Sequence, residues 1–114
     1  MKHEMRLHKK PFELIKSKIK TIELRLLDEK RSKIKIDDII EFENRITNEK
    51  IKTKVINLHK FSDFKELYKN FNKISLGYQE NEIANPIDME QYYPKEEQEK
   101  YGVVGIEIKV IDNE

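Results

Sequence analysis

The sequence has no cysteine and no tryptophan, and it has only three glycines and three prolines in 114 residues. Without cysteine, neither a disulfide framework nor a thiolate zinc site can form, so the small disulfide-rich secreted proteins are excluded. No run approaches the ~20 apolar residues that a membrane-spanning helix requires, and residues 1–4 lack the apolar core of a signal peptide. We therefore expect a cytoplasmic protein with no membrane contact.

Charge is abundant and unevenly distributed along the chain. Charged residues make up 39% of the sequence and apolar residues 37%, yet isoleucine recurs in four of the five predicted strands, which argues against disorder. Residues 1–60 carry 17 Lys and Arg against 10 Asp and Glu, a net charge of +7, whereas residues 61–114 carry 6 against 12, a net charge of −6. We expect one domain, residues 1–114, with a basic surface that favours an anionic partner at one face.

The periodicity of apolar residues predicts both strands and short helices. Alternation predicts five strands, at residues 3–7, 20–27, 39–44, 50–59 and 102–110. Helical spacing and capping residues predict four helices, one beginning near Pro11 and the others at residues 61–71, 85–92 and 94–101. Because these elements show no regular strand–helix alternation, they predict an α+β fold, a small mixed or antiparallel β-barrel decorated with short helices. Closure of the barrel is favoured because it removes exposed strand edges.

The predicted strand at residues 20–27 carries the most reactive set of side chains. Its apolar residues alternate with a hydroxyl, a carboxylate and a guanidinium, those of Thr21, Glu23 and Arg25. Lys20 opens the strand, and its long side chain can turn to either face. One interpretation is a half-buried strand with a solvated face and an ion pair worth ~0–1 kcal/mol. The other is an anion clamp of Lys20, Glu23 and Arg25 that suits a phosphate, a carboxylate or a nucleobase edge.

Residues 15–25, with the sequence IKSKIKTIELR, resemble the signature of the ASCH domain, a branch of the PUA-like superfamily. That signature is G-x-K-x-x-E-x-R, and its lysine, glutamate and arginine fall on Lys20, Glu23 and Arg25. The family glycine falls on Lys18, so the turn is made either without glycine or with Lys18 in a left-handed conformation, at some cost in energy. The similarity covers nearly the whole chain and includes Pro11-Phe12, Asp38-Ile39-Ile40, Tyr92-Tyr93-Pro94 and residues 101–106.

The resemblance implies a pseudo-barrel with a cleft on one side, lined by the three charged residues of the motif. Such domains are thought to bind RNA or modified nucleosides. The first functional class is therefore a binding module for RNA or a nucleoside-like small molecule, with Thr21 beside the motif and with Tyr92 and Tyr93 placed to stack on a base. Packing of a short helix onto the barrel explains the two tyrosines equally well.

The second functional class is a small hydrolase. Some family members are similar to an amidohydrolase of N4-acetylcytidine that uses a lysine, a threonine and a glutamate, and others are described as ribonucleases. The amidohydrolase lysine falls on Lys20, but its threonine falls on Glu23, and Glu90 is only a guess for its distant glutamate. An enzyme built on this chain would use Lys20 and Glu23 as its catalytic pair, with Arg25 stabilising an anion. The sequence leaves open whether the chain is an enzyme, and we favour the binding module because the threonine is absent.

Cofactors are not expected. The three histidines are scattered through the sequence without the spacing of metal ligands. We expect a monomer, and neither functional class needs a metal or other cofactor.

Overall fold

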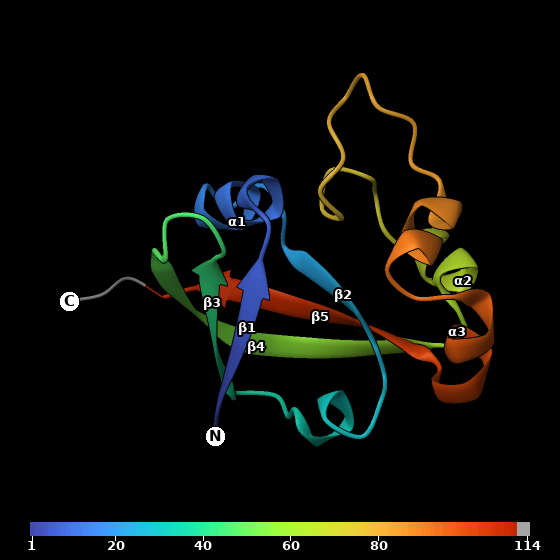
Figure 1. Ribbon diagram of the computed structural model, residues 1–114, viewed down its shortest axis with the longest axis horizontal. Helices are drawn as coiled ribbons and strands as arrows, with labels where there is room; N and C mark the ends of the chain where they lie inside the picture. The colour runs from blue at the N-terminus through green and yellow to red at the C-terminus, as the bar shows by residue number, and fades with distance from the viewer. Residues whose placement is uncertain (112–114) are drawn as a thin grey trace.

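The structure is a computed structural model that describes residues 1–111. Its centre is a five-stranded mixed sheet curled into a half-barrel, with the strand order β1–β3–β4–β5–β2 (Figure 1). The strands are β1 (Lys2–Leu7), β2 (Ile22–Leu26), β3 (Ile39–Asn44), β4 (Lys50–Phe61) and β5 (Val103–Val110). β1 runs parallel to β3, and all other neighbours are antiparallel. The predicted α+β, PUA-like fold is confirmed.

The half-barrel is open on one side. β1 and β2 are the two edges of the sheet, and within residues 1–111 they do not pair with each other. The sheet therefore does not close into a complete barrel and keeps two edges. Both edge strands are short, with six and five residues. Short edge strands present few unpaired backbone groups to other chains, which limits the disadvantage of leaving them open.

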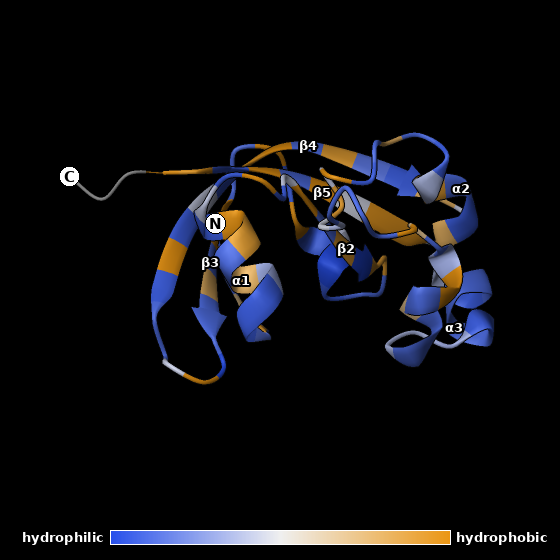
Figure 2. Cartoon of the chain, turned by 90° about the horizontal axis from the view of Figure 1, so that it is seen from above, coloured by the Kyte–Doolittle hydropathy of each residue, from blue (hydrophilic) through white to orange (hydrophobic). Residues whose placement is uncertain are grey.

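The helices lie at three places around the sheet (Figure 1). α1 (Lys9–Lys16) follows β1 directly, and the single-turn helix η1 (Arg31–Lys33) follows β2. α2 (Phe64–Tyr68), η2 (Pro86–Gln91) and the largely hydrophilic α3 (Lys95–Tyr101) lie together at the far end of the sheet from α1 (Figure 2). None of the helices in residues 1–111 is long and apolar enough to cross a membrane.

Side chains cap the starts of two of the helices. Asp63 accepts a hydrogen bond from the backbone N–H of Glu66 at 2.9 Å at the start of α2, and Asn85 accepts one from Ile87 at 3.0 Å at the start of η2. A side chain that accepts from a free N–H of the first turn in this way stabilises a helix by about 1 kcal/mol. The two caps therefore explain why such short helices begin where they do.

The predicted helix at residues 61–71 is wrong in its extent. α2 has only five residues, because β4 continues through Phe61 and the chain leaves the helix after Tyr68. Phe61 and Phe71 nevertheless contact each other, with ring centroids 6.2 Å apart, and both pack against the buried cluster that contains Phe64. The helical spacing of these aromatic residues thus reflects a common core cluster and not one continuous helix.

The buried apolar residues form two clusters. The first joins α1 to β1, β3, β4 and β5 and includes the fully buried Phe12 and Phe42. The second joins β2 to α2 and includes Leu24, Phe64 and Leu67. β2 is thereby covered on the face that carries Ile22, Leu24 and Leu26, and its polar side chains point to the opposite face.

Candidate functional site

A left-handed turn delivers the chain from α1 into β2. Lys18 has a φ of 69°, and its N–H donates to the carbonyl of Ile15 at 2.9 Å. The next two N–H groups, of Ile19 and Lys20, both donate to the carbonyl of Leu14 at 3.0 Å. Of the two ways to make this turn without the family glycine, the chain uses the strained left-handed lysine. The strand then begins at Ile22, two residues later than predicted.

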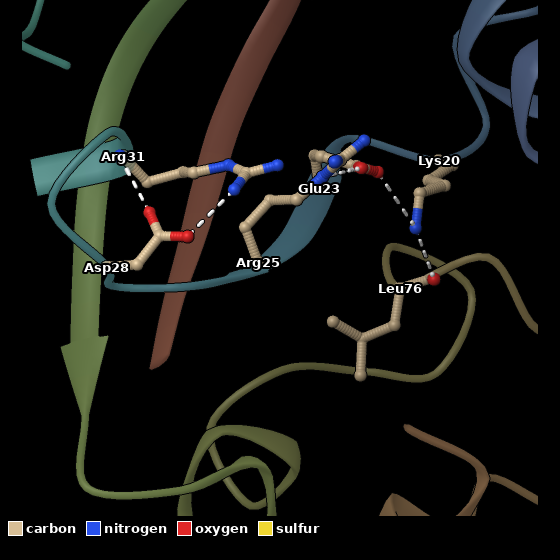
Figure 3. Close-up of polar contacts among 6 residues, drawn as sticks. All are labelled: Lys20, Glu23, Arg25, Asp28, Arg31 and Leu76. Atoms are coloured by element: carbon tan, nitrogen blue, oxygen red, sulfur yellow. Dashed lines mark hydrogen bonds and ion pairs between the residues drawn. The ribbon is translucent and has the colours of Figure 1, made fainter. Parts of the chain in front are cut away.

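The side chains of Lys20 and Arg25 both contact the carboxylate of Glu23 (Figure 3). The Nζ of Lys20 lies 3.6 Å from Oε1 of Glu23, and the Nε of Arg25 donates to Oε2 of Glu23 at 2.7 Å. Lys20 also donates to the backbone carbonyl of Leu76 at 3.0 Å. The prediction that the three charged groups meet is confirmed, and the direction of the Lys20 side chain is now defined, toward Glu23.

The cluster is buried, so a half-buried strand with a solvated face is the wrong interpretation. Lys20 is 7% exposed and Glu23 is 5% exposed. Part of the cover comes from Gly77, which has a φ of 106° and lies so close that a Cβ there would be 3.1 Å from Cδ of Lys20. Glycine is therefore needed at this position for its backbone conformation and for the space that it leaves to the lysine.

Burial and charge act in opposite directions on the two cations. Burial lowers the pKa of Lys20, and the neighbouring Glu23 carboxylate offsets this only in part. Burial also acts to lower the pKa of Arg25, but Glu23 and then Tyr93 outweigh it and raise the pKa. Arg25 thus stays charged, while Lys20 loses its proton more readily than a surface lysine. With both cations protonated, one carboxylate faces two positive charges.

A cavity of about 470 Å³ lies against this cluster. It draws residues from the end of β1, from α1, from β2, from residues 76–78, and from residues 88–89 and 91–93, and it has the size of a small-molecule site. Five of the six predicted ligand-binding residues line it, namely Lys20, Glu23, Arg25, Tyr92 and Tyr93.

The sixth predicted ligand-binding residue, Thr21, does not belong to the lining of this cavity within the described part of the chain. Its backbone instead joins two segments, since its N–H donates to Ser75 and its carbonyl accepts from Ile108. Glu90, the guess for the distant glutamate of the amidohydrolase, is exposed on η2 and is likewise outside the lining.

The two predicted stacking tyrosines differ in their surroundings. Tyr93 is partly buried, with its ring stacked on Phe64 at a centroid distance of 5.9 Å and an interplanar angle of 29°. Tyr92 is 54% exposed at the cavity, so its ring face is accessible. Packing against Phe64 therefore accounts for part of the Tyr93 ring, and Tyr92 has the more exposed ring at the cavity.

A second polar group on the cavity wall is not apparent from the sequence. Tyr68 donates to the hydroxyl of Tyr78 at 2.9 Å, and Tyr78 in turn donates to Oδ2 of Asp88 at 2.8 Å. Burial raises the pKa of both tyrosines, so both remain protonated at neutral pH. Tyr68 and Tyr78 are ten residues apart, as are Tyr78 and Asp88, and no local sequence pattern connects them. The sequence therefore did not predict this group.

The comparisons with known proteins agree on one family. A family model for the ASCH domain matches residues 5–112. The crystal structure of hypothetical protein PH0355 from Pyrococcus is 38% identical, with a TM-score of 0.82, and the match covers 97% of this chain and 100% of that chain. The solution NMR structure of protein PF0455 from Pyrococcus furiosus is 34% identical, with a TM-score of 0.72 and coverage of 99% and 100%. No curated protein matches the sequence.

Proposed function

Since the chain belongs to the ASCH domain family, whose members are generally thought to bind RNA, we propose that it is a binding module for RNA or a nucleoside-like ligand. The observation that carries the proposal is the buried cluster of Lys20, Glu23 and Arg25 on the cavity wall. Buried ion pairs contribute little to stability compared with apolar residues of the same volume. A purely structural strand would therefore be better served by aliphatic side chains, whereas recognition of a polar ligand needs charged groups held in place.

The chemistry of the cluster suits a nucleobase edge. The carboxylate of Glu23 accepts hydrogen bonds from an exocyclic amino group, and the ammonium of Lys20 donates to a ring carbonyl or ring nitrogen. Tyr92 offers an exposed ring face at the cavity, and stacking on such a ring is the usual way in which proteins hold an unpaired base. Together these groups support binding of single-stranded RNA, whose bases are free to leave the stack.

A hydrolase is the second candidate, and the burial of Lys20 is the observation that favours it. A lysine with a lowered pKa that lies 3.6 Å from a carboxylate is able to serve as a general base. In hydrolysis of an acetylated nucleobase, Lys20 would take a proton from the attacking water and pass it to the leaving nitrogen as acetate departs. Each oxygen of Glu23 already faces one cation, so in this candidate the carboxylate orients Lys20 and the lysine carries the proton.

Binding measurements with Tyr92→Ala test the proposal without disturbing the core. The wild type is expected to bind short single-stranded RNA with an affinity that falls as salt rises. Because loss of one base–aromatic stack costs about 1–3 kcal/mol, Tyr92→Ala should weaken binding by roughly 5- to 150-fold. Tyr101→Ala is the matched control, since Tyr101 is also partly exposed but lies on α3 outside the cavity.

Equal affinity of the wild type and Tyr92→Ala, or no binding of RNA and nucleosides at all, would rule out this module. The hydrolase is tested separately by release of acetate from N4-acetylcytidine. Activity in the wild type that disappears in Lys20→Ala would replace the binding module with the enzyme.

A further inference from the structure

A second cavity, of about 410 Å³, adjoins the first along the open side of the half-barrel. It is lined by β1 and β3 on one side and by Arg25 of β2 on the other, so it also lies between the two edge strands. The two cavities share three residues, Arg6, Arg25 and Arg45. A ligand longer than a single nucleoside would therefore pass from one cavity to the other across these guanidinium groups.

Positive charge predominates in the second cavity. Six of its lining residues are cations and three are carboxylates, the cations being Arg6, Arg25, Lys30, Arg31, Arg45 and Lys50. Two of the carboxylates have partners of their own, since Glu41 lies 3.4 Å from Nζ of Lys2 and Glu43 accepts from the side chain of Asn48. Of the six cations, only Arg25 and Arg31 form ion pairs with residues 1–111. The cavity thus has an excess of unpaired positive charge.

Arg31 is the most informative of these cations. The carboxylate of Asp28 accepts two hydrogen bonds from Arg31, one from the backbone N–H at 2.9 Å and one from Nη1 of the side chain at 2.8 Å. Its side chain extends toward Arg25 (Figure 3), and its Nε is buried without a hydrogen-bond partner in the described part of the chain. A buried donor without a partner is rare and destabilising, and an acceptor oxygen from a ligand would satisfy it.

We propose that the second cavity binds a phosphate group of the strand whose base occupies the first. The inference rests on the proposed function and narrows it, because the ligand is then an RNA strand or a phosphorylated nucleotide and not a free nucleoside. Phosphate oxygens match the planar donors of guanidinium groups, and Arg25, whose Nε is committed to Glu23, retains its terminal donors. Arg31 supplies the free Nε, and Arg6 and Arg45 border both cavities.

Nuclear magnetic resonance of the arginine Nε–H groups tests the phosphate subsite directly. Titration with inorganic phosphate should shift the Arg31 Nε–H signal, which is assigned by its absence in Arg31→Gln. Kd values for the four common nucleosides, their 3′- and 5′-monophosphates and a pentanucleotide then separate the sources of phosphate. A phosphorylated ligand should bind at least about 10-fold more tightly than its nucleoside, the gain expected for charge-assisted pairing with guanidinium groups.

Three variants isolate the contribution of the second cavity. Arg31→Gln should abolish the gain from phosphate and leave the Kd of the nucleosides unchanged. Lys50→Gln, at an exposed position in the same cavity, should reduce the gain by about threefold without touching the Asp28–Arg31 turn, in proportion to the loss of one peripheral phosphate contact. Lys60→Gln removes an exposed cation outside both cavities and should change nothing.

The outcomes distinguish the two proposals. If nucleosides and RNA bind, but phosphate adds no affinity and leaves the Arg31 Nε–H signal unmoved, the phosphate subsite is overturned and the binding module stands. If phosphate shifts that signal while neither nucleosides nor RNA bind, the subsite stands and the proposed function falls. A gain from the 3′-phosphate alone, the 5′-phosphate alone or only the pentanucleotide supports the subsite and gives the direction of the strand.

Discussion

Replacement of Glu23 by glutamine should destabilise the fold much more than removal of the lysine that it contacts. With an effective dielectric constant of about 20, the gross attraction of Glu23 to Lys20 at 3.6 Å is about 5 kcal/mol and that to Arg25 at 2.7 Å is about 6 kcal/mol. Desolvation of the three charges offsets most of this in the intact cluster. Glu23→Gln removes both attractions and leaves two buried cations, so we expect a loss of about 3–5 kcal/mol in the free energy of unfolding.

Lys20→Met removes a charge and keeps a side chain of similar length. Glu23 still has Arg25 as its partner, and the main loss is the hydrogen bond to the carbonyl of Leu76, so we expect a loss below about 2 kcal/mol. The double variant with Glu23→Gln should be less destabilised than the sum of the two single variants, because it leaves one buried cation in place of two.

Urea unfolding at pH 7 measures these differences, with Glu66→Gln as the control. Glu66 pairs with Lys69 at 3.0 Å on the surface, where such a pair is worth at most about 1 kcal/mol. Small and equal losses for Glu23→Gln, Lys20→Met and Glu66→Gln would refute the reasoning, because they would mean that water reaches the cluster in solution.

The dependence on pH gives a second test of the same cluster. Because the pKa of Lys20 is lowered in the folded state, the unfolded chain binds more protons between that lowered value and 10.5, and stability rises with pH across this window. Without Glu23 the pKa should be lower still. The deficit of Glu23→Gln relative to the wild type should therefore shrink between pH 7 and pH 10.

Three further substitutions test the surrounding structure. Lys18→Gly should stabilise the fold by about 0.5–1 kcal/mol and raise Tm, because relief of the left-handed lysine exceeds the entropy cost of glycine in the unfolded chain; an unchanged or lower Tm would contradict this. Gly77→Ala should destabilise by about 1–3 kcal/mol, since its φ is 106° and the new Cβ would lie 3.1 Å from Cδ of Lys20, and a Tm equal to that of the wild type would exclude the proposed contact. Asp38→Asn should destabilise by about 1 kcal/mol at pH 7, after allowance for solvent screening. The hydrogen bond with His3 and a backbone N–H hold the pKa of Asp38 at about 2, below its ordinary 3.8, so this difference should fade as unfolding is measured from pH 3.8 down to pH 2.

The strands could be predicted because apolar and polar residues alternate along them, as expected for a sheet with one buried and one exposed face. β3 (Ile39–Asn44) has the predicted bounds, since burial alternates strictly along it: Ile40, Phe42 and Asn44 are buried, and the residues between them are only partly buried. The helix at residues 61–71 could not be predicted correctly, because Phe61, Phe64 and Phe71 reach one cluster from a strand, a helix and a turn. Spacing in the sequence does not distinguish this arrangement from a single helix face.

The membership of the charged cluster could be predicted, but its burial could not. The family motif brings Lys20, Glu23 and Arg25 together within six residues of one strand and its entrance. Their cover comes from Leu76 and Gly77, which lie more than fifty residues further along the chain, and no local pattern connects the two segments. The same separation hides the second cavity, which combines residues of β1, β3, β4 and η1.

The open side of the half-barrel and the excess of positive charge are consistent with one another. Arg6 on β1 and Arg25 on β2 both border the two cavities, so closing the sheet at this side would bring two guanidinium groups together away from water. Repulsion between like charges increases as water is excluded, which opposes pairing of the two edge strands. An anion between the arginines would reverse the sign of this interaction. The charges that oppose closure of the sheet at this side are therefore the ones that the proposed phosphate site requires.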